Sequence, residues 1–171
     1  MKTLVDHLAQ YAAYHRDFRN IVTHVIGIPM IVVAVAILLS RPSFALLDWT
    51  LSPAVLVAVT GAVFYVRLDL RFGAVMTALL ALSVLAGQLL AAQSTDIWLA
   101  WGLGLFVVGW IIQFVGHYYE GRKPAFVDDV MGLAVGPLFV VAEIAFWLGL
   151  RDDVRHEVEA RSGPVRTAAS Q

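Results

Sequence analysis

The fold is decided by a stretch without Asp, Glu, Lys or Arg, residues 97–119: IWLAWGLGLFVVGWIIQFVGHYY. Residues 21–40 and 72–95 have the same character. Each stretch reaches the roughly 20 residues that an α-helix needs to cross the hydrocarbon core of a bilayer. Across the chain 60% of the residues are hydrophobic and 15% are charged, whereas soluble domains carry about 25% charged residues. The composition excludes a water-soluble enzyme and predicts an all-α, polytopic membrane helix bundle.

The predicted organisation is a single integral-membrane helical domain, residues 1–150, with four transmembrane helices. A polar, flexible C-terminal tail is expected to follow over residues 151–171. Residues 3–18 have the apolar and polar faces of an amphipathic helix lying at the membrane interface. Asn20 is placed to cap the first transmembrane helix, because asparagine is among the preferred N-cap residues.

Two apolar stretches depart from an ordinary membrane span. Residues 51–66 are short for a span unless Arg67 extends its charged end to the headgroups. Residues 130–150 are interrupted by Gly136-Pro137 and carry one acid, Glu143. This fifth segment is either a full span or a re-entrant segment broken at Gly136-Pro137, and we favour a re-entrant or tilted path.

The basic residues predict the orientation of the chain. If the first four segments cross, one side of the membrane holds most of the Lys and Arg residues of the loops: Lys2, Arg16, Arg19, Arg67, Arg71, Arg122 and Lys123. The loops on the other side hold Arg41. By the positive-inside rule we expect the N-terminus to be cytoplasmic.

Two absences limit the chemistry. The chain has no cysteine, which excludes disulfides, thiolate metal sites and iron–sulfur clusters. The formal net charge is −1 and the basic residues are scattered, so the sequence offers no basic patch for nucleic acid.

Three histidines are predicted to lie at one depth in the membrane. His15 and His24 flank the cytoplasmic start of the first span, and His117 lies near the cytoplasmic end of the fourth. On one continuous helix His15 and His24 would point in opposite directions. They converge only if the chain turns between them.

The fourth span adds a polar stripe to this group. Gln113, His117 and Glu120 lie on one helical face, and Gly116 beside them permits close approach of another helix. Histidines with one carboxylate and open coordination positions suit Fe(II) that activates oxygen. The alternative interpretation is that the histidines only satisfy helix ends and lipid headgroups.

Glu143 has three possible roles, because a buried carboxylate is either paired or protonated. Glu143 is expected to be a fourth metal ligand, a partner that orients a histidine, or a structural acid that pairs with an arginine. We favour the second and the third of these roles. The basic residues near the site either determine topology or grip a substrate carboxylate.

Two short motifs then point to a known family. The first is H-x4-N-x3-H-x2-G-x-P, which begins at His15, and the second is G-H-x2-E-x3-P-A, which begins at Gly116. Both stand intact, and Gly136-Pro137-Leu138-Phe139 resembles a further hydrophobic motif. With Tyr14-His15-Arg16-Asp17, these residues resemble the membrane-bound 2-hydroxy fatty acid dioxygenase family over about residues 10–148.

The resemblance implies an Fe(II)-dependent α-oxidation. A 2-hydroxy fatty acid and O2 would give a fatty acid one carbon shorter, with loss of the carboxyl carbon. His15, His24 and His117 would be the iron ligands, and Glu120 a further ligand or a base. Glu120 and Asn20 are the candidate catalytic residues. The expected metal is Fe(II), with Zn as a metal that a purified sample can carry instead.

The resemblance also implies where the substrate would lie. The acyl chain would lie among the apolar helices and membrane lipid, while the hydroxy-carboxylate head reaches the cytoplasmic interface. Candidate substrate-binding residues are Arg16, Arg19, Arg122, Lys123 and Gln113. We expect an integral protein of a bacterial inner membrane.

Two other functions remain open at this point. His24 and His117 are also a possible pair of axial ligands for a b-type haem, which would make the protein an electron carrier. A non-enzymatic membrane scaffold or small transporter is the third hypothesis. The polar residues cluster at one interface and do not line a path through the midplane, which argues against transport.

Overall fold

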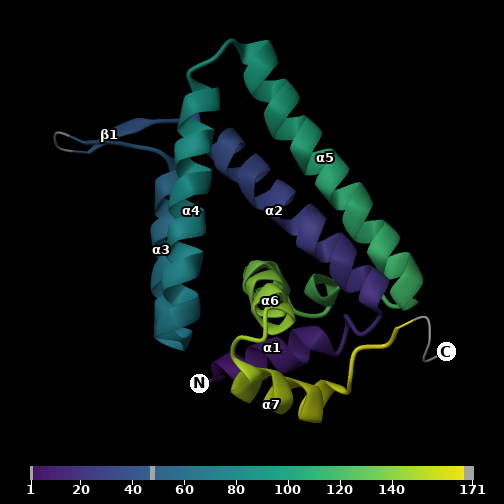
Figure 1. Cartoon of the computed structure of the whole chain (residues 1–171). Helices are drawn as coiled ribbons and strands as arrows, with labels where there is room; N and C mark the ends of the chain where they lie inside the picture. The colour runs from purple at the N-terminus through teal and green to yellow at the C-terminus, as the bar shows by residue number, and fades with distance from the viewer. Residues whose placement is uncertain (1, 47–48, 168–171) are drawn as a thin grey trace. The chain divides into compact units, whose positions relative to one another are not determined.

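The computed structural model describes residues 2–46 and 49–167, and these residues are almost entirely helical, as predicted (Figure 1). In chain order the elements are α1 (Leu4–Ala12), α2 (Phe18–Ser40), β1 (Phe44–Leu46), β2 (Trp49–Leu51), α3 (Pro53–Leu68), α4 (Leu70–Ala91), α5 (Thr95–Glu120), the 3-10 helix η1 (Ala125–Val127), α6 (Met131–Trp147) and α7 (Asp152–Ser162). The antiparallel pair β1–β2, with Phe44 opposite Leu51, was not predicted.

Three of the four predicted transmembrane helices are long and apolar enough to cross a membrane: α2, α4 and α5. The remaining one, α3, is apolar but has only 16 residues. Large apolar side chains on α4 face outward, including Leu82 at 61% and Leu89 at 63% exposure. Such a surface suits a lipid solvent, since contiguous apolar patches are rare on soluble monomers.

The described chain forms two compact units. One consists of Met1–Ile28 and Ile111–Gln171, and the other of Pro29–Trp110. The predicted histidine group falls within the first unit. The second unit contains α3 and α4, which lie side by side (Figure 1).

The turn between α3 and α4 is a single residue, Asp69. Its carboxylate accepts the Phe72 N–H at 2.9 Å, which caps the first turn of α4. At Gly73 an added Cβ would lie 2.5 Å from the Cα of Val66. Only glycine allows this close backbone approach, so the sequence forces a tight helical hairpin here.

In the first unit, α1 begins with a capping box. The Asp6 N–H donates to Thr3 Oγ1 at 3.2 Å and the Thr3 N–H donates to Asp6 Oδ2 at 2.7 Å. The helix packs against both α6 and α7 and ends at Ala12, earlier than the predicted residue 18. Arg16 and Asp17 lie beyond its end and are buried.

The predicted cap at Asn20 is wrong. Helix α2 already begins at Phe18, and Asp17 is the residue whose carboxylate accepts the Arg19 N–H at 2.9 Å. Asn20 lies in the first turn with its side chain buried. Because α2 begins before Asn20, the Asn20 side chain does not cap the helix, and its amide is available to contact another segment of the chain.

The predicted break at Gly136-Pro137 is also wrong, because α6 runs through both residues. The helix ends instead at Trp147, and positive φ angles at Gly149 (69°) and Arg151 (60°) turn the chain. Helix α7 then departs at 116° to α6. Thus residues 152–162, which we expected in a flexible tail, are helical.

Candidate metal centre

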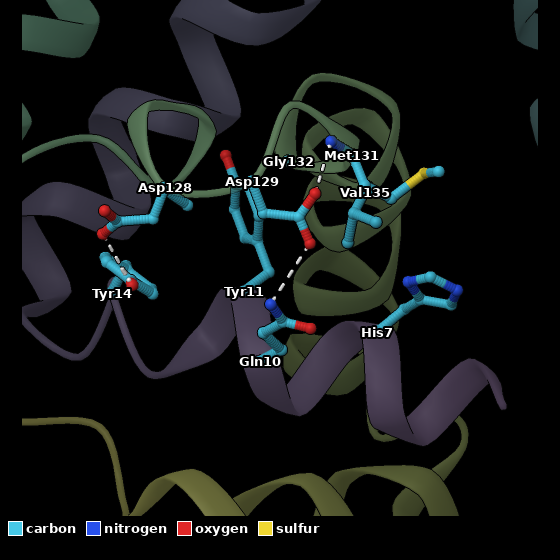
Figure 2. Close-up of a pocket in the computed structure, with 10 residues that line it drawn as sticks. His7, Gln10, Tyr11, Tyr14, Asp128, Asp129, Met131, Gly132 and Val135 are labelled. Atoms are coloured by element: carbon cyan, nitrogen blue, oxygen red, sulfur yellow. Dashed lines mark hydrogen bonds between the residues drawn. The ribbon is translucent and has the colours of Figure 1, made fainter. Parts of the chain in front are cut away.

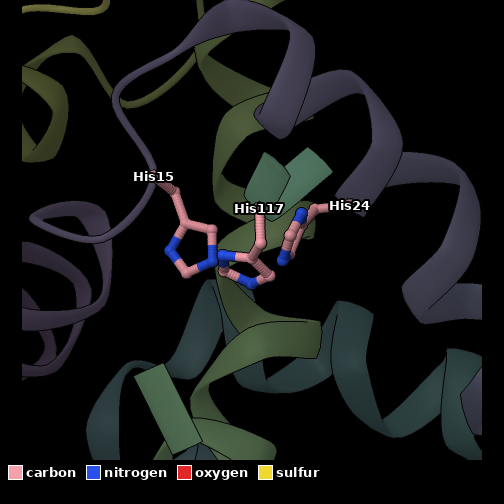
Figure 3. A group of neighbouring side chains, drawn as sticks. All are labelled: His15, His24 and His117. Carbon is pink, nitrogen blue, oxygen red and sulfur yellow. The ribbon is translucent and has the colours of Figure 1, made fainter. Parts of the chain in front are cut away.

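Three imidazole rings meet inside the first unit (Figure 3). His15 lies in the connection between α1 and α2, His24 in the second turn of α2, and His117 in the last turn of α5. The ring centroids are 4.4 Å apart for His15 and His24, 5.1 Å for His15 and His117, and 5.0 Å for His24 and His117. One ring nitrogen from each residue lies within 4.8 Å of the other two. The predicted convergence of these histidines, which required a turn after His15, is found.

Two of the rings are oriented by backbone carbonyls of their own segments. Nδ1 of His15 lies 2.7 Å from the Tyr11 carbonyl, and Nδ1 of His24 lies 2.8 Å from the Asn20 carbonyl. Because a carbonyl oxygen only accepts, each Nδ1 carries the proton and each Nε2 keeps its lone pair. Hydrogen bonding of this kind from the second ring nitrogen is typical of metal-ligating histidines.

The remaining ring nitrogens fit a cation. His15 Nε2 and His117 Nδ1 are buried and have no hydrogen-bond partner within the described residues. A buried polar atom without a partner carries a free-energy cost of about 1–3 kcal/mol. A divalent cation held by three nitrogen lone pairs would remove this cost.

Burial also sets the protonation state of His15, whose side chain is fully enclosed. Desolvation, and then the proximity of His24, lower the pKa of His15 well below 6.5. A neutral imidazole is the form that binds metals. The environment therefore favours the ligand form over the imidazolium.

An aromatic wall holds the His15 ring in place. The Tyr11 ring stacks on it with a centroid distance of 4.2 Å and an interplanar angle of 8°, and Phe139 lies 5.6 Å away. At Gly136 an added Cβ would lie 2.9 Å from the Tyr11 hydroxyl. The glycine on α6 therefore makes room for the tyrosine that positions His15.

Tyr11 also lines a pocket of about 80 Å³ between α1 and the start of α6 (Figure 2). Its two carboxylates are already engaged: Tyr14 donates to Asp128 at 2.9 Å and Gln10 donates to Asp129 at 3.3 Å. The pocket is therefore a polar recess that shares one wall, Tyr11, with the histidine group.

Glu120 lies outside the histidine group, although it is one turn from His117. Its side chain is 1% exposed, and Oε2 accepts the backbone N–H groups of Arg16 at 2.9 Å and Asp17 at 2.8 Å. Oε1 accepts from Arg166 at 2.6 Å. The carboxylate thus ties the end of α5 to the segment that carries His15.

Asn20 and Gln113 are buried close to the histidines. Asn20 Nδ2 donates to Glu120 Oε2 at 3.1 Å, and its Oδ1 is buried without a partner among residues 2–46 and 49–167. Gln113 Nε2 donates to the Thr23 carbonyl at 3.5 Å. Both residues link α2 to α5 beside the rings.

The four basic candidates for substrate binding have partners within the protein. Arg19 pairs with Asp17 at 2.8 Å and Lys123 with Asp128 at 2.6 Å. Arg122 donates to the Ala13 carbonyl at 2.9 Å. None of these three approaches the rings through a contact that the described residues show.

Arg16 differs because its guanidinium is buried. Nε donates to the Ala12 carbonyl at 2.7 Å and Nη1 to the Gly163 carbonyl at 2.9 Å. Nη2 lies 3.7 Å from Glu143 and has no hydrogen-bond partner in the part of the chain that the structure describes. Of the three roles considered for Glu143, the structure supports that of a structural acid that meets an arginine.

Two residues of the site were missed by sequence reasoning. Tyr11 stands four residues before His15, a helical spacing that suggests a contact. Arg166 lies in the segment expected to be a flexible tail, and no local pattern marks it. Its role follows only from the fold.

Comparisons with known proteins show which family the sequence matches. The sequence model of the family described as "2-hydroxy-palmitic acid dioxygenase Mpo1-like" matches residues 1–148. The chain is 33% identical over 165 residues to the 2-hydroxy-palmitic acid dioxygenase MPO1 of Saccharomyces cerevisiae, covering 93% of this chain and 91% of the yeast protein. No solved structure matches the chain.

Proposed function

The chain belongs to the Mpo1-like 2-hydroxy-palmitic acid dioxygenase family, and on that premise we propose that it is an Fe(II)-dependent 2-hydroxy fatty acid dioxygenase. The product would be the fatty acid one carbon shorter. The conversion balances with O2 as the oxidant when the carboxyl carbon leaves as CO2 and water forms. The observation that carries the proposal is the group of three buried imidazoles, His15, His24 and His117.

The protein supplies a preorganised set of neutral ligands. The Tyr11 and Asn20 carbonyls hold His15 and His24 with their Nε2 lone pairs available. When bound, Fe(II) supplies the redox chemistry between substrate and O2, and three protein ligands leave it open positions. Glu120 acts in this proposal as a positioning residue and not as a ligand, because its oxygens are taken by Arg16, Asp17 and Arg166.

Arg16 is the strongest of the candidates for the substrate carboxylate. It follows His15 in the chain, and its buried Nη2 has no hydrogen-bond partner among the described residues and lies 3.7 Å from Glu143. A guanidinium suits a carboxylate, and the substrate carboxylate would share this donor with Glu143. We propose that the acyl chain of the substrate lies in membrane lipid among the apolar helices, and that the site faces the cytoplasm.

The haem alternative loses support from the ring geometry. A haem with two axial histidines lies between them, whereas the His24 and His117 centroids are 5.0 Å apart and the His15 ring touches both. This arrangement leaves no space for a macrocycle. The absorption spectrum of the purified protein is therefore expected to lack a Soret band.

The test begins with anaerobic purification and elemental analysis. We expect iron bound to the wild type, and formation of pentadecanoic acid from 2-hydroxypalmitic acid and O2. The variants His15→Ala, His24→Ala and His117→Ala should lose both. His156→Ala is the matched control, because His156 lies exposed on α7, and it should retain both.

Two results would contradict parts of the proposal. Unchanged metal content in the triple histidine variant would favour the scaffold hypothesis. If iron is bound but no pentadecanoic acid forms, the metal site is supported and the proposed substrate is contradicted.

A further inference from the structure

The segment after α7 returns to the connection that carries His15. The Arg166 N–H donates to the Arg16 carbonyl at 2.7 Å, and the Phe18 N–H donates to the Arg166 carbonyl at 3.0 Å. Asp17 and Arg166 thus form a parallel β-bridge. The Arg16 side chain adds a third link through its hydrogen bond to the Gly163 carbonyl. Residues 163–167 are therefore held against residues 16–18 by backbone pairing.

The Arg166 side chain completes the environment of Glu120. Its Nη2 lies 2.6 Å from Glu120 Oε1, and the Glu120 side chain is 1% exposed. The other oxygen of the same carboxylate accepts the Arg16 and Asp17 N–H groups. A buried carboxylate needs a counter-charge, because desolvation penalises the ionised form. The described residues provide this counter-charge at hydrogen-bond distance through Arg166.

These contacts act on the histidine of the three whose backbone lies outside a helix. His24 and His117 are held by helices α2 and α5, whereas His15 lies between helices. The position of His15 relative to the other two rings depends on how residues 13–17 are held. Both the carboxylate and the C-terminal segment hold this connection directly after His15.

We propose that residues 163–167 form a C-terminal clamp that positions His15, with Arg166 as its principal positioning residue. The clamp lies beyond residues 1–148, which the family match covers. The inference rests on the proposed function for one measurement, metal binding. The effect of the clamp on the backbone of residues 14–18 does not depend on that function.

Arg161 provides a matched control within the same C-terminal region. It also pairs with a carboxylate at 2.6 Å, that of Asp6, and its side chain is 48% exposed against 53% for Arg166. The Arg161 pair connects α7 to α1 and does not reach the connection that carries His15. The two arginines therefore share residue type, pairing distance and similar exposure, whereas the paired carboxylates differ, with Glu120 1% exposed and Asp6 38% exposed.

The experiment compares wild type with Arg166→Gln, Arg166→Lys and Arg161→Gln as full-length proteins in detergent. Backbone hydrogen exchange of residues 14–18 is measured without metal, and Co(II) binding is followed by its ligand-field absorption. For Arg166→Gln we expect exchange at least tenfold faster and Co(II) affinity about tenfold weaker, within the range for lost supporting contacts of a metal site. Arg166→Lys should restore part of both, and Arg161→Gln should match wild type.

The clamp is overturned if Arg166→Gln exchanges and binds Co(II) as wild type does, or if Arg161→Gln has an equal effect. If the wild type binds no metal, the proposed function is contradicted. The hydrogen-exchange comparison of the variants then still tests whether the clamp exists. Normal Co(II) spectra with unchanged exchange in every variant would remove the clamp and leave the proposed function standing.

Discussion

Glu120 illustrates how a single residue joins distant parts of this chain. Its spacing from His117 is compatible with a ligand on the same helical face, but its oxygens accept from Arg16, Asp17, Asn20 and Arg166. A carboxylate that accepts this many hydrogen bonds is a structural anion. It has little capacity left for a cation, although it is close to the rings.

Replacement of Glu120 by Gln should therefore act on stability first. The amide keeps the size of the side chain but loses the charge that pairs with Arg166 and one acceptor oxygen. We expect the free energy of unfolding to fall by about 2 kcal/mol, the usual range for hydrogen bonds to a charged group. Thermal unfolding in detergent measures this change.

Glu157→Gln is the control for that measurement, because the Glu157 side chain is 61% exposed and pairs with Arg161 on the same helix at 3.7 Å. Exposed pairs contribute little, so its melting temperature should equal that of wild type. Equal melting temperatures for both variants would contradict the anchoring role of Glu120.

At the scale of elements, the contact between the start of α2 and the end of α5 depends on Gly116. An added Cβ there would collide with Thr23 Oγ1 and Asn20 Oδ1. The prediction that Gly116 permits close approach of a neighbouring helix is confirmed. The approach matters because it sets His24 on α2 opposite His117 on α5.

Gly116→Ala is expected to separate the two helices. Overpacking of this kind costs about 1–3 kcal/mol, and the shift should also lower the metal content of the purified protein. Gly104→Ala on the same helix is the control, because nothing lies within 4 Å of its added Cβ. Melting temperature and elemental analysis measure both effects, and equal behaviour of the two variants would refute the close-packing argument.

At the scale of the whole molecule, the apolar helices predict how the chain is oriented in a membrane. The distribution of basic residues predicts that the N-terminus lies in the cytoplasm and the connection between α4 and α5 outside. The chain has no cysteine, so single cysteines report topology without further changes. In intact cells, a membrane-impermeant maleimide should label Gln93→Cys, while Gln10→Cys should react only after permeabilisation.

The cysteine-free wild type is the blank for this labelling. Labelling of Gln10→Cys in intact cells, with Gln93→Cys protected, would reverse the proposed orientation. It would also place the histidine group at the outer face, since Gln10 lies on α1 close to His15.

The sequence predicted the helices well where apolar runs are long. It also identified the three histidines, because polar residues in such runs are few and their depth follows from the helix ends. It did not predict the partners of Glu120, the pairing of Arg166 with residues 16–18, or the break after Trp147. Those features depend on contacts between residues far apart in the chain, or on the φ angles of a short connection.

By itself, then, the amino-acid sequence determined the helical character of the chain, its apolar surface and the presence of three imidazoles at the ends of its apolar stretches. These properties follow from local composition and spacing, because helix length and hydrophobicity are summed residue by residue. The tertiary structure alone decided which nitrogens face one another and that Glu120 holds the backbone beside His15. These contacts depend on which groups from distant parts of the sequence come together in the fold. Because a buried polar atom without a partner costs free energy, the arrangement that pairs most of these atoms is favoured.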